Sequence, residues 1–154
     1  NMEKIIIEKA FSYNIFRLPQ VLGNNNKNQL IGFLYESIKM EKSFELFDIE
    51  RNIIDIQDIF IIIDKILKEN VFKNQIINIA NPKNIKVLDL VNILENITDK
   101  KAKYDIVKKS GEFKIDVKDI ESIISDLGIF EKNYLENRIK KYYEWTNKCN
   151  TSSV

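Results

Sequence analysis

Short strand-like runs alternate with helical patterns along almost the whole of this 154-residue chain. The strand-like runs are rich in β-branched and aromatic residues, whereas the helical stretches repeat apolar residues every three to four positions. Such alternation is typical of an α/β fold, in which crossover helices join parallel strands. We therefore predict strands over 13–18, 44–47, 52–56, 75–80 and 103–109, and helices over 2–11, 28–40, 58–68, 87–98, 119–127 and 131–146.

Local signals set the expected ends of these elements. Asp58 and Asp119 stand at the starts of two helical patterns, where a carboxylate can accept a hydrogen bond from an unpaired backbone N–H. Gly128 follows the helix that ends at 127, and glycine suits the left-handed position after a helix. The continuous apolar run 75–80 predicts a strand that is covered on both faces. We expect a single α/β domain over 1–146 and a disordered tail over 147–154.

Composition excludes several classes of protein. The 24 basic and 23 acidic residues almost cancel, so no nucleic-acid partner is expected, since general nucleic-acid binders are strongly basic. No apolar run approaches the roughly 20 residues of a membrane span, so no membrane partner is expected either. With no histidine and only Cys149, the chain offers no metal ligand set, and its cysteine usage favours the reducing cytoplasm.

Four stretches of sequence follow one another at characteristic intervals. They are "YNIFRLPQVLG" from Tyr13, "RNIIDIQDI" from Arg51, "IINIANPKNIKVLDLVNIL" from Ile76 and "KKSGEFKIDVKDIESIISDLGI" from Lys108. In this order they resemble the extended short-chain dehydrogenase/reductases, the NAD-dependent epimerases and dehydratases that act on nucleotide sugars. The resemblance covers residues 2 to about 146.

The resemblance implies that the chain corresponds to the C-terminal, substrate-binding portion of such a Rossmann-type enzyme. Residues 1–18 would be a remnant of the Rossmann half, and residues 19–146 would be the substrate-binding region. The family's Gly-x-x-Gly-x-x-Gly loop and Tyr-x-x-x-Lys pair do not occur in the sequence, so no residue is predicted to be catalytic. NAD or NADP would serve the complete enzyme, and neither is expected to bind to this chain alone.

The resemblance also implies a site for the diphosphate of a nucleotide sugar, with Arg51 and Lys109 as its cations. A planar guanidinium can bind two phosphate oxygens at once, whereas lysine supplies charge without that geometry. The alternatives stay open at this point. Arg51 could be a solvated partner of Glu50 or Asp48, and Lys109 could be one lysine of a charged run.

Four further positions take roles from the same resemblance. Gln20 stands where many relatives have an asparagine that can bond a phosphate or a sugar hydroxyl, although it could also be an exposed loop amide. Phe47 matches an aromatic near the nucleotide base, but an aromatic at the end of a strand is more often core. The Gly-Asp-Gly hairpin that usually follows this aromatic is missing. Pro19 and Val21 would lie beside the nicotinamide.

A second class of function competes with the enzyme. The chain could be a non-enzymatic, degenerate half-domain that binds a partner or assembles as a homo-oligomer. The first helix and strand would then expose apolar surface, and large exposed apolar patches are typical of interfaces. We expect self-association through residues 2–18. An unrelated α/β binding domain is the third possibility.

Overall fold

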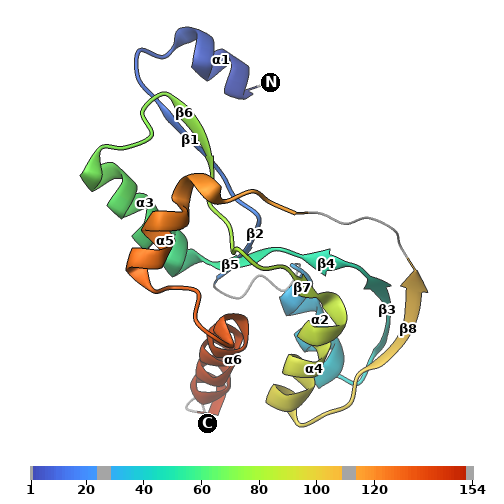
Figure 1. The fold of residues 1–154 in the computed structure, drawn as a ribbon. Helices are drawn as coiled ribbons and strands as arrows, with labels where there is room; N and C mark the ends of the chain where they lie inside the picture. The colour runs from blue at the N-terminus through green and yellow to red at the C-terminus, as the bar shows by residue number, and fades with distance from the viewer. Residues whose placement is uncertain (1, 24–28, 109–113, 152–154) are drawn as a thin grey trace.

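The computed structural model describes residues 2–23, 29–108 and 114–151 (Figure 1). Its helices are α1 Met2–Lys9, α2 Leu30–Lys39, α3 Ile56–Glu69, α4 Val87–Thr98, α5 Glu121–Leu127 and α6 Tyr134–Thr151, with a 3-10 turn η1 at Lys118–Ile120. Its strands are β1 Asn14–Arg17, β2 Gln20–Leu22, β3 Ser43–Asp48, β4 Glu50–Arg51, β5 Ile53–Asp55, β6 Gln75–Asn78, β7 Ile85–Lys86 and β8 Lys103–Lys108.

The strands pair in twos, and most of the pairs are parallel. β1 pairs with β6, β2 with β5 and β3 with β8, all parallel, while β4 and β7 form a short antiparallel pair. Each parallel pair joins strands with at least one helix between them in the chain. Crossover connections of this kind define the α/β class, which confirms the class predicted from the alternating pattern.

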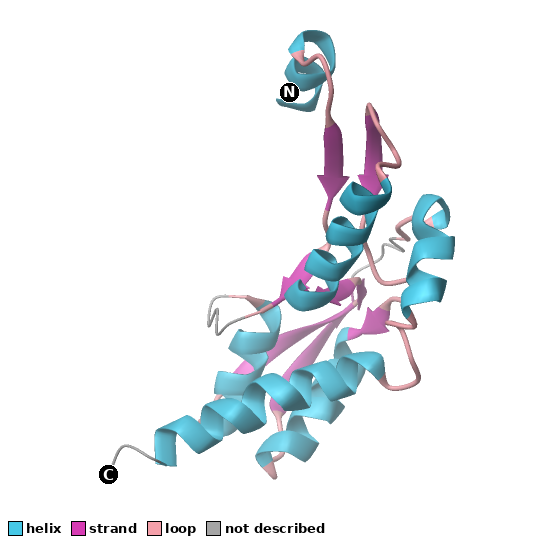
Figure 2. Cartoon of the chain, turned by 90° about the vertical axis from the view of Figure 1, so that its left-hand side faces the viewer, coloured by secondary structure: helices cyan, strands magenta, loops and turns pink. Residues whose placement is uncertain are grey.

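Two hydrophobic clusters fill the interior, and β5 lies between them. The first cluster joins α2, α4 and α6 to β3, with Leu34, Ile38 and Leu90 almost fully buried. The second joins α3 and α5 to β6. Ile53 belongs to the first cluster and Ile54 to the second, because successive side chains of a strand point to opposite faces. Figure 2 shows the helices around these strands and α1 set apart at one end.

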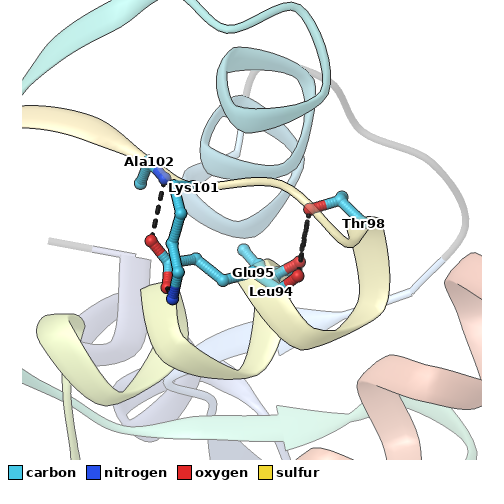
Figure 3. A network of polar contacts seen from close by, with 5 residues as sticks. All are labelled: Leu94, Glu95, Thr98, Lys101 and Ala102. Atoms are coloured by element: carbon cyan, nitrogen blue, oxygen red, sulfur yellow. Dashed lines mark hydrogen bonds and ion pairs between the residues drawn. The ribbon is translucent and has the colours of Figure 1, made fainter.

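The Glu95 carboxylate stabilises the connection from α4 to β8. Glu95 accepts hydrogen bonds from the Ala102 backbone N–H at 2.8 Å and from Lys101 Nζ at 2.7 Å (Figure 3). Both contacts lower the pKa of Glu95, the lysine contributing more than the backbone N–H. One side chain therefore fixes the turn that leads into β8.

The predicted helix starts at Asp58 and Asp119 are wrong. α3 begins earlier, and Asp55 is its N-cap, accepting from the Gln57 N–H at 2.7 Å. Asp58 instead lies buried in the first turn, because Tyr134 and Arg138 bind its carboxylate. Asp119 lies inside η1, and α5 begins after Ile120 without a side-chain cap.

The other boundaries match the expectation in part. α4 spans 87–98 as predicted, and Gly128 adopts the left-handed conformation with φ of 59° after α5. β6 ends at Asn78, two residues before the predicted end, and Ile77, Ile79 and Ala80 of the predicted run are fully buried. α6 continues to Thr151, beyond the predicted helix end at 146, and the disordered tail stays a prediction. Residues 152–154 lie outside the described ranges.

Candidate functional site

The strands β3 and β8, which precede the two predicted phosphate-binding cations in the sequence, end side by side. These strands pair in parallel over six residues, and the last pair joins Asp48 to Lys108. Arg51 follows Asp48 after a two-residue step, and Lys109 comes directly after Lys108. Lys109 itself lies outside the described residues. In α/β folds, ligands bind beyond the carboxyl ends of parallel strands.

Arg51 lies on β4 and is exposed to solvent. Its backbone pairs with Ile85 of β7. Within the described ranges its guanidinium forms no ion pair, so pairing with Glu50 or Asp48 is not observed there. The Glu50 carboxylate instead accepts from Asn84 Nδ2 at 3.3 Å. A planar cation at a strand end, open to solvent, has the chemistry needed to bind a phosphate.

Gln20 begins β2, a strand that the sequence patterns leave as a loop. Its backbone N–H donates to the Asn52 carbonyl at 3.2 Å, and its register partner on β5 is Ile53. Gln20 is half-buried.

Phe47 is not a core residue. It lies next to the end of β3, opposite Val107, and 39% of it is exposed. It therefore lies near the carboxyl ends of β3 and β8. Aromatic side chains that stay exposed beside a basic edge can stack on a nucleotide base, so the sequence prediction for Phe47 stays a prediction with a compatible geometry.

Pro19 and Val21 flank Gln20 on the other side of the strand. Val21 is half-buried and packs against the second cluster. It also lines an open pocket of about 990 Å³ between the start of α3 and α6, together with Gly23, Ile56 and Tyr142. Pro19 is half-buried. Nothing in this geometry identifies the molecule that would lie against these two residues.

A buried polar cluster beside this pocket is the feature that sequence reasoning missed. The Tyr134 hydroxyl donates to Asp58 Oδ2 at 2.7 Å and accepts from the Asp55 backbone N–H at 2.9 Å. Arg138 Nη2 donates to Asp58 Oδ1 at 2.7 Å. The cluster ties β5 and α3 to α6. The only signal in the sequence is an aspartate at the margin of the apolar face of α3, which helix capping explains equally well.

Burial sets the protonation of this cluster. It raises the pKa of Tyr134 far above that of a free tyrosine, and the neighbouring Asp58 carboxylate raises it further. Burial, followed by the Asp55 carboxylate, raises the pKa of Tyr142 to about 12. Both phenols therefore stay protonated at neutral pH. The Tyr134 hydroxyl accordingly donates its proton to Asp58.

No group of three or more His, Cys, Asp or Glu side chains in the described ranges could hold a metal ion. No helix in these ranges is both long and apolar enough to cross a membrane.

The fold is similar to that of several solved enzymes. The Bordetella bronchiseptica enzyme WbmG, in complex with NAD and UDP, matches with a TM-score of 0.77 and 16% identity over 96% of this chain and 48% of its own. The UDP-glucose 4-epimerase of Thermotoga maritima, with UDP-glucose, matches with a TM-score of 0.71 and 20% identity over 96% of this chain and 50% of its own. The chain shares the fold of half of these enzymes.

The structure of a reductase is also similar to this chain. The GDP-mannoheptose C4 reductase of Campylobacter jejuni, with NADP bound, has a TM-score of 0.69 and 19% identity over 94% of this chain and 52% of its own. No protein-family model and no curated protein matches the sequence. The chain thus spans about half the length of these structures. The likeness confirms the α/β fold class expected from the sequence.

Proposed function

We propose that this chain is the substrate-binding part of an NAD(P)-dependent nucleotide-sugar epimerase, dehydratase or reductase. Arg51 carries the proposal, because it is an exposed guanidinium without an ion pair to the described residues, at the carboxyl edge of β3 and β8. Its role is to bind the diphosphate, with Lys109 as the second cation and Gln20 as a hydrogen-bonding neighbour. Phe47 would face the nucleotide base. Fixing the diphosphate also fixes the sugar, which is catalysis by positioning.

The cofactor fits this chain only in part. When bound to the complete enzyme, NAD or NADP accepts a hydride from a sugar carbon or returns it. Pro19 and Val21 can offer apolar contact to the nicotinamide, but the sequence has no glycine-rich loop to hold the dinucleotide phosphates. We therefore expect the isolated chain to bind nucleotide diphosphates weakly and to turn nothing over. Its single cysteine agrees with a cytoplasmic location.

Titration of UDP, UDP-glucose and a GDP-sugar into the chain and into Arg51→Ala tests the proposal. A charge-assisted hydrogen bond is worth about 1.5–3 kcal/mol, so the dissociation constant should rise roughly tenfold to a hundredfold in the variant. Arg17→Ala is the matched control, because Glu3 already neutralises that guanidinium at 2.7 Å. Equal binding by the chain and by Arg51→Ala would remove Arg51 from the site.

One observation favours the second class of function. α1 has no buried residue, and Phe11 just beyond it is fully exposed. Such a surface is what a partner-binding or oligomerising half-domain would need. This alternative and the enzyme are compatible, because an oligomer can also bind a nucleotide.

A further inference from the structure

We propose that Asn52 is a positioning residue, which fixes the backbone on both sides of Arg51 and also binds the backbone of Gln20. The inference rests on the proposed function, since it assigns the residue that presents the diphosphate-binding guanidinium. Asn52 is almost fully buried, with 4% exposed, and lies between β4 and β5. Figure 1 shows these strands in the middle of the molecule, next to β2 and β7.

The Asn52 side chain uses its whole amide. Its Nδ2 donates to the Asn81 carbonyl at 2.7 Å and to Asn84 Oδ1 at 3.0 Å. The Asn52 Oδ1 accepts from the Asn81 N–H at 3.1 Å. Separately, the backbone carbonyl of Asn52 accepts from the Gln20 N–H at 3.2 Å. Two donors and an acceptor in one plane are what an asparagine offers and what an aspartate or a leucine lacks.

The loop 81–84 that receives these bonds is fixed in turn. Asn81 is also buried; its Nδ2 donates to the Ile53 carbonyl at 3.3 Å, and its Oδ1 accepts from the Lys83 N–H at 3.0 Å. We call Asn52, Asn81 and Asn84 the asparagine cluster. Because the cluster joins β5 to the loop before β7, it determines how β4 lies against β7.

Both chain neighbours of Arg51 are held by the asparagine cluster. Asn52 follows it in the sequence, and Glu50, which precedes it, accepts from Asn84 Nδ2 at 3.3 Å. This contact engages the carboxylate that lies nearest to Arg51 in the sequence. The Arg51 backbone is anchored opposite Ile85, while its guanidinium faces solvent. Preorganisation of this kind lowers the entropic cost of binding an anion.

A double-mutant cycle on UDP affinity tests the inference. Asn52→Asp places an acceptor where Nδ2 donated, and it keeps the backbone carbonyl that binds Gln20. We expect the UDP dissociation constant to rise roughly tenfold in Asn52→Asp, but less than about twofold when the same substitution is added to Arg51→Ala. Independent, multiplying effects would show that Asn52 does not act through Arg51.

Asn14→Asp is the matched control. Asn14 Nδ2 also donates to a backbone carbonyl, that of Phe72 at 2.7 Å, but at the distant β1–β6 pair. We expect it to change the UDP dissociation constant less than about twofold. A loss of affinity as large as that of Asn52→Asp would make general destabilisation the cause and overturn the inference.

Amide hydrogen exchange, measured by NMR without a ligand, tests whether Asn52 fixes the backbone around Arg51. Asn52→Asp should speed exchange at Gln20 and in the β4–β7 pair roughly tenfold more than in β3 and β8. Uniform or unchanged exchange would overturn the inference even if UDP binds. If the chain bound no UDP, the proposed function would fail. The exchange result would still show whether Asn52 fixes β4 against β7.

Asn84→Ala is the variant to use if Asn52→Asp does not fold. Asn84 is half-buried, and its replacement removes the contacts to Asn52 and Glu50 while leaving the bonds between Asn52 and Asn81. Faster exchange confined to β4 and β7, with weaker UDP binding, supports the inference. Exchange and affinity equal to those of the parent chain would contradict it.

Discussion

Tyr134 shows how one residue can join elements that are far apart in the sequence. Its hydroxyl lies between the Asp55 N–H and the Asp58 carboxylate, more than 70 residues away along the chain. Its ring stands edge-on to Phe130, with centroids 4.8 Å apart. Removing the hydroxyl would leave the Asp55 N–H unpaired in the interior, and an unpaired buried donor costs more than the average hydrogen bond.

We expect Tyr134→Phe to lower the free energy of unfolding by about 1–3 kcal/mol. Urea unfolding checks this, and the midpoint should fall while the slope stays constant. Tyr13→Phe serves as the control, because the Tyr13 hydroxyl has no hydrogen bond to the described residues. Equal stability of the two variants would mean that the Tyr134 hydroxyl contributes nothing.

At the scale of elements, the turn from α4 to β8 depends on a charged contact. α4 ends at Asp99 in the left-handed conformation, with φ of 54°. Glu95 then holds Lys101 and the Ala102 N–H, and its side chain is only 14% exposed (Figure 3). Because these contacts require the ionised carboxylate, they link the stability of the turn to pH.

Glu95→Gln should weaken the protein at neutral pH but not in acid. The pKa of Glu95 is lowered in the folded state, so its contribution is fully present above the ordinary glutamate pKa of roughly 4.3 and is lost as the pH falls through the lowered value. Thermal unfolding of both proteins from pH 7 to pH 3 should show their difference shrinking. The exposed Glu45→Gln provides the baseline. A constant difference across this range would contradict the role of the charge.

At the scale of the whole molecule, the apolar side chains of α1 and of Phe11 are exposed to solvent. Met2, Ile5, Ile7 and Phe11 are 77%, 54%, 45% and 102% exposed. An eight-residue helix is marginal in water by itself, and so is a two-stranded sheet. α1 contacts the strand after it through an exposed ion pair, Glu3 with Arg17, which adds little.

We therefore expect the chain to self-associate through residues 2–18. Light scattering over a concentration series should show dimers or larger species, and Phe11→Ser with Ile5→Ser should shift the equilibrium toward monomer at least roughly tenfold, since each buried apolar side chain contributes about 1.5–3 kcal/mol. Phe60→Ser, on the 69%-exposed Phe60 of α3, is the control. A monomer at high concentration would contradict this expectation.

The site residues chosen from the sequence stay predictions. Arg51, Gln20 and Phe47 take their roles from the resemblance, and the structure places them on β4, β2 and β3. Their contacts with a ligand stay predictions, and Lys109 lies outside the described residues. The asparagine cluster was not predicted, because a buried asparagine and a loop asparagine look alike in one sequence.

The sequence by itself determined the helices, most of the longer strands and the position of Gly128. These depend on residues within one or two turns of each other, so apolar spacing and backbone preference suffice to predict them. Only the tertiary structure decided the short strands β2, β4 and β7, the burial of Asp58 and the contacts of Asn52. A two- or three-residue strand has too few side chains to carry a period, and a buried polar group is defined by partners distant in the chain. Both exist only once the long-range contacts have formed.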